Sequence, residues 1–395
     1  MSIAVDPTFL PKLERFGAFD VNACFNCGNC TAVCPLSEGH DTFPRKMIRY
    51  AQIGDRDRLL ACKELWLCYY CGECSDTCPR QAEPGEFMAS ARRYAIASYE
   101  PTGISYMLYT SKLFTTAFMV MLSVFFTLLL LSGHGPMLEG APRLFDMDDM
   151  TGFLSFDLIH DTGLALFGVA GLVAVGGIAR MALRLSRTTA RARTSEGNTD
   201  TETRRPLARI SSAVRNVVAE LAAQRRYRDC QEEATVAWYR GRWFIHMSIM
   251  WGFVGLGVAT ALDYLLLIVA DKVPGQPDPL WWPTRLVGTL AGLFLMYGTS
   301  LALIERYRKP DKYASHSLLS DWLFLWLLWL AGLTGFVLEG ALYLPNMATW
   351  GYVVFLVHVV VAMELIVLLP FTKFAHSVYR PIALLIHELG RNTAG

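Results

Sequence analysis

Six long stretches that are nearly free of charged residues constrain this sequence more than any other feature. They cover residues 113–132, 162–179, 243–262, 286–304, 322–338 and 350–372, and Glu364 interrupts the last. With its flanks, each stretch is long enough to cross a hydrocarbon core of about 30 Å as a helix, a form that satisfies its backbone hydrogen bonds inside lipid. A single run of this kind also suits a buried helix of a soluble protein, but six in series predict a membrane domain.

The distribution of basic residues predicts how these helices are oriented. The connection from Arg180 to Arg242 contains fourteen arginines, and residues 305–317 contain four further basic residues, whereas the other three loops contain three in total. By the positive-inside rule, both termini and the long basic connection face the cytoplasm. The N-terminal residues lack the basic start and apolar run of a secretory signal. We therefore expect a multi-pass protein of the inner (cytoplasmic) membrane, and the charge distribution gives no support for nucleic-acid binding.

The long basic connection divides into two parts. Residues 188–206 are polar and rich in turn-forming residues, which predicts a flexible linker. From Leu207 to Leu221, apolar residues recur at helical spacing beside arginines, which predicts an amphipathic helix. Such a helix lies either on the membrane or a partner, or against its own domain, and the sequence leaves both arrangements open.

Two cysteine ladders precede the apolar stretches. The first ladder is CFNCGNCTAVCP at residues 24–35, and the second ladder is CYYCGECSDTCP at residues 68–79. Both have the spacing C-x2-C-x2-C-x3-C-P, in which three thiolates bind one [4Fe-4S] cluster and the fourth cysteine binds the other cluster. The predicted ligands are Cys24, Cys27, Cys30 and Cys78 for one cluster, and Cys68, Cys71, Cys74 and Cys34 for the other.

Zinc and disulfide bonds are the alternatives for cysteines at such close spacing. Zinc ribbons use paired C-x2-C knuckles without the fourth cysteine and proline, and the cytoplasm keeps thiols reduced, so two [4Fe-4S] clusters are favoured. Between the ladders, apolar residues recur at helical spacing, with Pro44 at a helix start and Gly54 at a break, which predicts a helical ferredoxin-like domain. We expect Cys62 to be a packed thiol and Cys230 to be structural or incidental.

Histidines near the apolar stretches are the candidate haem ligands, because coordinating residues inside a membrane are costly and mark functional sites. His358 and His376 are eighteen residues apart, which corresponds to five turns of one helix and places both on one face, about 27 Å apart along the axis. His160 matches the depth of His358 toward the outer side, and His246 matches His376 toward the cytoplasm. These pairs predict two b haems stacked across the bilayer. Hydrogen bonding to a neighbouring helix is the alternative for each histidine.

The other histidines have weaker claims to a role. His134 and His316 are reserve candidates for haem ligands, and we expect His40 and His387 to lie on the surface. The sequence contains no G-x-G-x-x-G dinucleotide fingerprint after a strand and no recognisable nucleophile, so we expect no soluble-substrate site on this chain.

At the two ladders, the sequence resembles the C subunit of heterodisulfide reductases and the C-terminal half of the succinate dehydrogenase iron-sulfur subunit. With the ladders fused to a membrane domain, it resembles the C subunit of the quinone-interacting membrane-bound oxidoreductase (Qmo) complexes, whose C-terminal part is similar to the haem-binding gamma subunit of respiratory nitrate reductase. The resemblance implies cytoplasmic flavin and iron-sulfur partners like the A and B subunits of Qmo, and a link to adenylylsulfate reductase in dissimilatory sulfur metabolism. The chain departs from the gamma subunit pattern because His160 and His246 lie on different stretches.

The expected fold class is all-α, with a helical ferredoxin-like domain that holds two [4Fe-4S] clusters and a six-helix transmembrane cytochrome b domain. The expected segments are the di-cluster domain at 1–100, two transmembrane helices in 101–182, the basic cytoplasmic linker with its amphipathic helix at 183–241, four transmembrane helices in 242–376 and a cytoplasmic tail at 377–395. The expected function is electron transfer between menaquinone or ubiquinone, through b haems, and a cytoplasmic flavin or iron-sulfur partner. The alternatives are the membrane component of a tricarballylate-type dehydrogenase system and a membrane redox sensor or transporter without haem.

Overall fold

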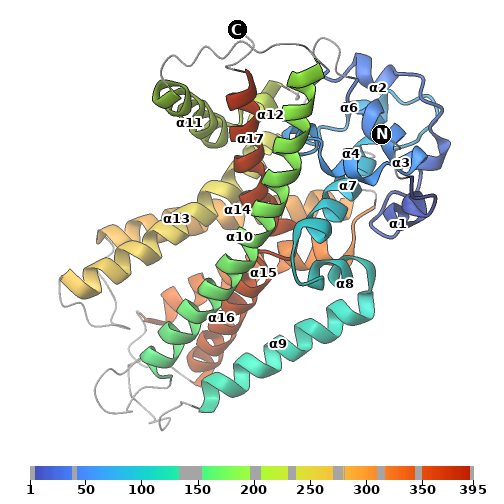
Figure 1. The fold of residues 1–395 in the computed structure, drawn as a ribbon. Helices are drawn as coiled ribbons and strands as arrows, with labels where there is room; N and C mark the ends of the chain where they lie inside the picture. The colour runs from blue at the N-terminus through green and yellow to red at the C-terminus, as the bar shows by residue number, and fades with distance from the viewer. Residues whose placement is uncertain are drawn as a thin grey trace.

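A computed structural model describes residues 5–37, 42–132, 154–195, 206–229, 237–269, 279, 281–308, 316–342 and 349–391 of the chain. Every regular element in these residues is a helix, so the predicted all-α class is confirmed. The short N-terminal helices, α11 (Pro206–Ala223) and α17 (His376–Arg391) lie at the same end of a set of long helices (Figure 1).

Six helices are long and apolar enough to cross a membrane, and they coincide with the six predicted stretches. They are α9 (Lys112–Ser132), α10 (Phe156–Ser195), α13 (Arg242–Val269), α14 (Pro283–Arg308), α15 (Leu319–Leu342) and α16 (Thr349–Leu368). Large apolar side chains on them remain exposed, as Leu113 (82% exposed) and Leu172 (76% exposed) illustrate. Exposed apolar surface of this extent marks a contact with lipid or another protein.

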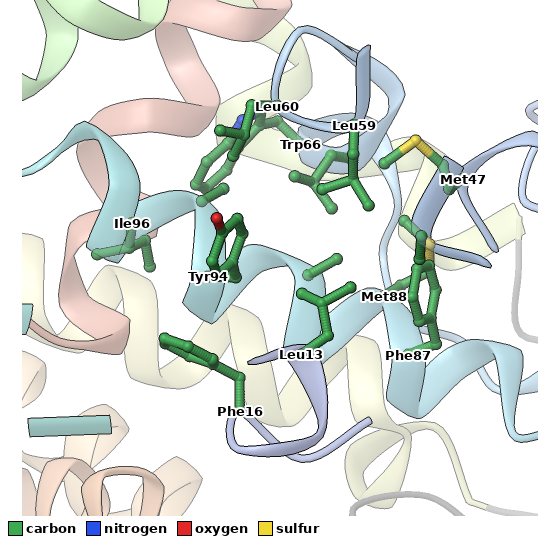
Figure 2. Close-up of a cluster of buried hydrophobic side chains, with 14 of the residues drawn as sticks. Leu13, Phe16, Met47, Leu59, Leu60, Trp66, Phe87, Met88, Tyr94 and Ile96 are labelled. Carbon is green, nitrogen blue, oxygen red and sulfur yellow. The ribbon is translucent and has the colours of Figure 1, made fainter. Parts of the chain in front are cut away.

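The N-terminal lobe consists of short helices packed around one longer helix. Its elements are α1 (Phe9–Glu14), η1 (Val21–Ala23), α2 (Asn29–Ala32), α3 (Arg45–Ile53), α4 (Arg56–Leu60), α5 (Glu64–Leu67), α6 (Glu73–Asp76), α7 (Pro84–Tyr99) and α8 (Ile104–Thr110). Figure 2 shows Leu13, Met47, Leu59 and Trp66 of four different helices gathered with Phe87 of α7, and none of these side chains is more than 2% exposed. Their burial supplies the apolar driving force that holds the lobe together.

The break predicted between the ladders lies at Gly54. This residue ends α3 with a φ of +77°, and a Cβ there would lie 2.3 Å from the carbonyl oxygen of Asp6, so both the backbone angle and the space require glycine. The Asp55 side chain then caps α4 by accepting a hydrogen bond of 3.1 Å from the Arg58 backbone N–H.

Close backbone contact joins α13 to α14. A Cβ on Gly252 would lie 2.5 Å from the backbone nitrogen of Leu295, and one on Gly298 would lie 2.8 Å from the carbonyl oxygen of Ile245. Small residues at these positions let the two helices approach as membrane helices commonly do. The same two helices position His246, which lies one residue after Ile245.

The basic connection contains α11 (Pro206–Ala223), α12 (Arg225–Asp229) and η2 (Trp238–Arg240). One side of α11 packs against α17 (His376–Arg391), where Asn216 Nδ2 donates to Glu388 Oε2 at 3.3 Å. Leu207 and Val218 of the predicted apolar face remain 80% and 58% exposed, so both arrangements of the amphipathic helix stay open. The predicted flexible linker is wrong at its start, since α10 continues to Ser195. Alanine and arginine favour helix, and extending an existing helix avoids a new nucleation cost. Residues 196–205 lie outside the described structure.

The last apolar stretch does not continue as one helix to His376. Helix α16 ends at Leu368, a turn follows, and the short helix η3 (Lys373–Ala375) leads into α17. Pro370 has no N–H to continue the helix, and Thr372 is extended, with φ −115° and ψ −165°. The prediction that His358 and His376 share one helical face, five turns apart, is therefore wrong.

Candidate functional site

The two cysteine ladders have the same local backbone geometry. Gly28 and Gly72 occupy equivalent positions with φ of +93° and +99°, and each directly precedes a short helix, α2 or α6. Asn26 and Tyr70 both have a φ of +60°. Each donates its backbone N–H to the sulfur of the cysteine two residues earlier, at 3.4 Å and 3.3 Å. The repeated spacing in the sequence thus corresponds to a repeated loop that turns amides toward sulfur.

The thiols that the structure brings together come from both ladders. Burial raises the pKa of the Cys24 thiol, the Asn26 backbone N–H opposes this rise, and Cys78 of the second ladder adds to it together with Cys27. Burial raises the pKa of Cys34 to about 12, with further contributions from Cys68 and Cys71. The division of the eight cysteines between two clusters stays a prediction. Helices α2 and α6 pack together, and Asn29 Nδ2 donates to the Thr77 carbonyl oxygen.

This donor set fits a cluster with several irons. A buried thiolate is unfavourable alone, and positively charged iron offsets that cost. The Ala82 backbone N–H donates to Cys78 Sγ at 3.4 Å, a type of bond that tunes cluster potentials. In the described part of the chain, no three cysteine, histidine or acidic side chains are close enough to hold a single metal ion. A [4Fe-4S] cluster does not need that closeness, since each thiolate binds a different iron.

His246 of α13 and His376 at the start of α17 face each other, and their ring centroids are 6.3 Å apart. Two imidazoles on opposite sides of one metal, with bonds of about 2.0–2.1 Å, also have centroids about 6 Å apart. His376 Nδ1 contacts the Lys373 carbonyl oxygen, an arrangement that leaves Nε2 available to a metal. Both rings therefore fit a bis-histidine haem.

His358 and His160 have different surroundings. His358 Nδ1 of α16 lies 2.8 Å from Thr334 Oγ1 of α15, which also leaves Nε2 available. His160 of α10 stacks on Tyr264 of α13, with ring centroids 5.1 Å apart and an interplanar angle of 14°. These two histidines contact different helices, so their pairing on one haem stays a prediction.

The other residues that the sequence singled out either pack within the structure or lie outside the described residues. The reserve candidate His316 pairs with the N-terminal lobe, because its Nε2 lies 2.6 Å from Asp20 Oδ2. His387 is half-buried, not fully on the surface as expected. Cys62 packs against the core of the lobe, as expected for a packed thiol. The remaining predictions concern His40, His134 and Cys230, which lie outside the described residues.

Sequence reasoning missed an aromatic bridge between the second ladder and the paired histidines. Tyr69 lies between two ladder cysteines and stacks on Tyr227 of α12, with centroids 5.2 Å apart and an interplanar angle of 10°. Tyr227 in turn meets His246 edge to face at 5.9 Å. Because Tyr227 lies in a short helix of the basic connection, no periodicity in the sequence could have identified it.

Two arginines fix this bridge to the ladder. Arg380 of α17 lies over the Tyr69 ring at 3.7 Å, a cation–π contact. Arg242, the first residue of α13, donates to the Cys71 carbonyl oxygen at 2.8 Å. Burial raises the pKa of Tyr69, so its phenol stays neutral at physiological pH. Helices α13 and α17, which carry the paired histidines, are thereby attached to the second ladder.

Comparison with known families identifies the N-terminal lobe. Residues 20–82 match the family described as 4Fe-4S dicluster domain, and all eight ladder cysteines fall inside that range. The match covers the lobe alone and leaves the membrane helices unassigned.

Relatives among characterised proteins come from heterodisulfide reductases. The C subunit of the H(2):CoB-CoM heterodisulfide,ferredoxin reductase of Methanothermobacter thermautotrophicus is 32% identical over 63 residues, which are 16% of this chain and 34% of that protein. A protein of Archaeoglobus profundus described as like the C subunit of heterodisulfide reductase is 35% identical over 98 residues, or 23% of this chain and 52% of that protein. The E subunit of the dihydromethanophenazine:CoB--CoM heterodisulfide reductase of Methanosarcina mazei is 22% identical over 161 residues, which are 38% of this chain and 61% of that protein.

These matches are partial, since the chain spans between 34% and 61% of the length of the three relatives. No solved structure matches the chain. The protein thus combines an iron-sulfur electron-transfer domain similar to the C subunit of heterodisulfide reductases with six apolar helices, and it also shares sequence similarity with the E subunit of such reductases.

Proposed function

We propose that the protein transfers electrons between a membrane quinone and a cytoplasmic flavin or iron-sulfur partner docked on the N-terminal lobe. The observation that carries the proposal is the continuous contact from Tyr69 in the second ladder through Tyr227 to His246 and His376. It joins the residues that would hold an iron-sulfur cluster to those that would hold a haem, without a gap of solvent.

The cofactors would supply one-electron carriers, and the chain would hold them in fixed positions. The eight ladder thiols would bind two [4Fe-4S] clusters, and His246 and His376 would bind the b haem nearer the lobe. His160 and His358 would hold a second b haem toward the other side of the membrane. Stacked and edge-to-face rings keep the protein between the cofactors closely packed. Arg380 holds the Tyr69 ring, and Arg242 holds the start of α13 against Cys71 of the second ladder.

A lipid-soluble redox partner suits the membrane end. Each menaquinol or ubiquinol that is oxidised releases two electrons and two protons, and the electrons leave through the lobe to the partner. As its name states, the Methanosarcina relative acts between dihydromethanophenazine and a CoB–CoM heterodisulfide, which supports redox exchange with a reduced carrier. A Qmo-like assembly with two flavoprotein subunits, linked to adenylylsulfate reductase, is the proposed setting, with the lobe and both termini in the cytoplasm.

Cofactor content tests this function directly. The full-length protein, purified from membranes, should contain about ten irons per chain, eight of them with labile sulfide, and should show a b-type haem band on reduction with dithionite. A reduced spectrum without that band would remove the proposed function.

The ligand assignment needs a variant and a matched control. Replacing His376 with Ala should remove one haem and leave both clusters in place, because His246 alone gives a single axial ligand. His387→Ala, a half-buried histidine on the same helix, should retain both haems. Full haem content in the His376→Ala protein would show that the pair is not a haem site.

A further inference from the structure

The surface of helix α11 divides into three sides, and the first side is covered by the chain itself. Asn216 Nδ2 donates to Glu388 Oε2 of α17 at 3.3 Å, and Arg209 Nη2 donates to the Leu389 carbonyl oxygen at 3.3 Å. Val217 is buried on the same side. These contacts fix how α11 is rotated about its own axis.

Four large apolar side chains form the second side, the exposed stripe. They are between 43% and 80% exposed and are Leu207, Ile210, Val214 and Val218. Intervals of three and four residues place all four on one face of a helix. At 3.6 residues per turn, Val214 lies about 160° around the helix from Asn216, so α17 does not cover the stripe. An apolar stripe of this extent marks a contact with lipid or with another protein.

Small and polar residues form the third side of α11. They are all exposed, and they are Ala208, Ser211, Arg215 and Ala219. In residues 206–229, every charged side chain that the structure describes as exposed is an arginine: Arg215, Arg225 and Arg228. A helix that lies in the surface of a membrane combines an apolar face with basic residues in this way, because arginines attract anionic head groups.

Two indole rings join the C-terminal end of α11 to the membrane helix α13. Trp243 Nε1 donates to the Ala223 carbonyl oxygen at 3.0 Å, and Trp251 Nε1 donates to the Ala222 carbonyl oxygen at 3.2 Å. Carbonyls of the last helical turn lack partners within their own helix, so these indoles supply bonds that α11 needs. The end of α11 is therefore held at the depth of two tryptophans of α13.

The side of α13 that meets α11 is itself a lipid-facing surface. Trp251 is 47% exposed and begins a row of exposed apolar residues on α13 that continues with Val254 and Val258. Because α13 is long and apolar enough to cross a membrane, this row is suited to acyl chains. Tryptophan is enriched where acyl chains meet head groups, which gives the level of α11. Figure 1 shows α11 beside α17 and crosswise to the long helix α10, the direction expected for a helix in the plane of the surface.

We propose that α11 lies in the surface of the bilayer on the lobe side. The exposed stripe enters the boundary between acyl chains and head groups, and the neighbouring arginines contact anionic phosphates. The third side then faces water, while the side of Asn216 stays against α17. A second copy of the chain and a soluble partner protein are the competing occupants of the stripe. The proposal does not depend on the proposed function, because it concerns lipid and not electrons.

Photocrosslinking to lipid tests this position of α11. The full-length protein carries p-benzoylphenylalanine at Val214 and is irradiated in nanodiscs that contain equal amounts of phosphatidylglycerol and phosphatidylcholine. Mass spectrometry of the intact chain then counts the added lipids. Val214 should capture lipid about as often as Val258 of α13, the positive reference. Ala219, exposed on the third side of the same helix, is the matched control and should capture almost none.

Three results would overturn the proposal. Equal lipid capture at Val214 and Ala219 would show that the stripe has no preference for the membrane. Adducts between two copies of the chain would assign the stripe to a protein interface. Loss of lipid adducts at Val214 while Val258 keeps them would leave the stripe in water or free for a soluble partner. Val218 is the second position on the stripe if the Val214 variant does not fold.

The head group in the adducts tests the arginines. Phosphatidylglycerol should be captured at Val214 about fivefold more often than phosphatidylcholine, the preference that one arginine near an anionic surface supplies. Arg215→Gln combined with Arg225→Gln should abolish this preference. Arg49→Gln, which removes an exposed arginine of α3, should leave it unchanged. Equal capture of the two lipids while all arginines are in place would overturn their contact with anionic head groups.

Discussion

A buried ion pair ties the N-terminal lobe to the membrane helices, and its removal should destabilise that junction. Arg93 Nη2 of α7 lies 2.6 Å from Asp321 Oδ2 of α15, and the two side chains are 9% and 1% exposed. Arg93 Nη1 also donates to the Phe16 carbonyl oxygen at 2.7 Å. One guanidinium thus connects the start of the chain, α7 and a membrane helix.

The magnitude follows from what each replacement leaves behind. Arg93→Leu leaves Asp321 with Lys373 as its nearest cation, whose Nζ is 3.7 Å from Oδ1. Breaking a buried pair in this way costs about 3–5 kcal/mol, because a charge stays buried without its partner. Replacing both residues with leucine removes both charges but leaves the Phe16 carbonyl and the Leu318 backbone N–H without these partners, at about 1–3 kcal/mol each. The double replacement should therefore cost less than the sum of the two single ones.

Loss of iron-sulfur absorbance on heating in detergent measures the effect. Each single variant should lose its clusters about 10 °C below the unmodified protein, and the double variant should lose them less than about 20 °C below it. Arg93→Lys, which keeps the charge but not the two-pronged geometry, should fall between the unmodified protein and Arg93→Leu. If the two single effects simply add in the double variant, the pair is not coupled and the reasoning is refuted.

Three further outcomes test the bridge, the crossed ligand sets and the helix packing. Tyr227→Ala should slow electron exchange between cluster and haem while Tyr227→Phe preserves it, as followed by flash-induced haem oxidation; equal rates would exclude a role for the ring. Cys78→Ala should remove the same cluster signal as Cys24→Ala, with about four irons lost in each case by electron paramagnetic resonance and iron assay, and loss of different signals would contradict the pairing. Gly252→Leu should force α13 away from α14, because an added Cβ would lie 2.5 Å from the Leu295 nitrogen. The replacement should lower the free energy of unfolding by at least about 1–3 kcal/mol and reduce the yield of haem-loaded protein. An unchanged yield would count against the close contact.

The N-terminal lobe illustrates how far local sequence reasoning reaches. The C-x2-C-x2-C-x3-C-P spacing places cysteines on loops whose geometry is set by neighbouring residues, and Gly28 and Gly72 take the positive φ that such loops need. The helical spacing between the ladders likewise predicts the elements around Gly54. These features depend on residues a few positions apart, so one sequence suffices to predict them.

The histidines mark the limit of that reasoning. A periodicity of 3.6 residues places His358 and His376 on one face only while the helix continues, and Pro370 ends it. The approach of His246 to His376 is set by how α13 packs against α17. The sequence predicts how deep each histidine lies in the membrane, but it does not predict which neighbouring helix each histidine faces. His160 illustrates the same point, because its stacking on Tyr264 depends on the packing of α10 against α13.

The sequence by itself determined the helical class, the six apolar helices and the two cysteine ladders, because hydropathy and ligand spacing act over one helix or one loop. The tertiary structure alone decided the Tyr69–Tyr227–His246 bridge and the Arg93–Asp321 junction. Each of these joins residues that are far apart in the sequence, or on helices whose mutual rotation is set by close packing. Such contacts have no periodicity along the chain, so they arise only when the whole chain is folded.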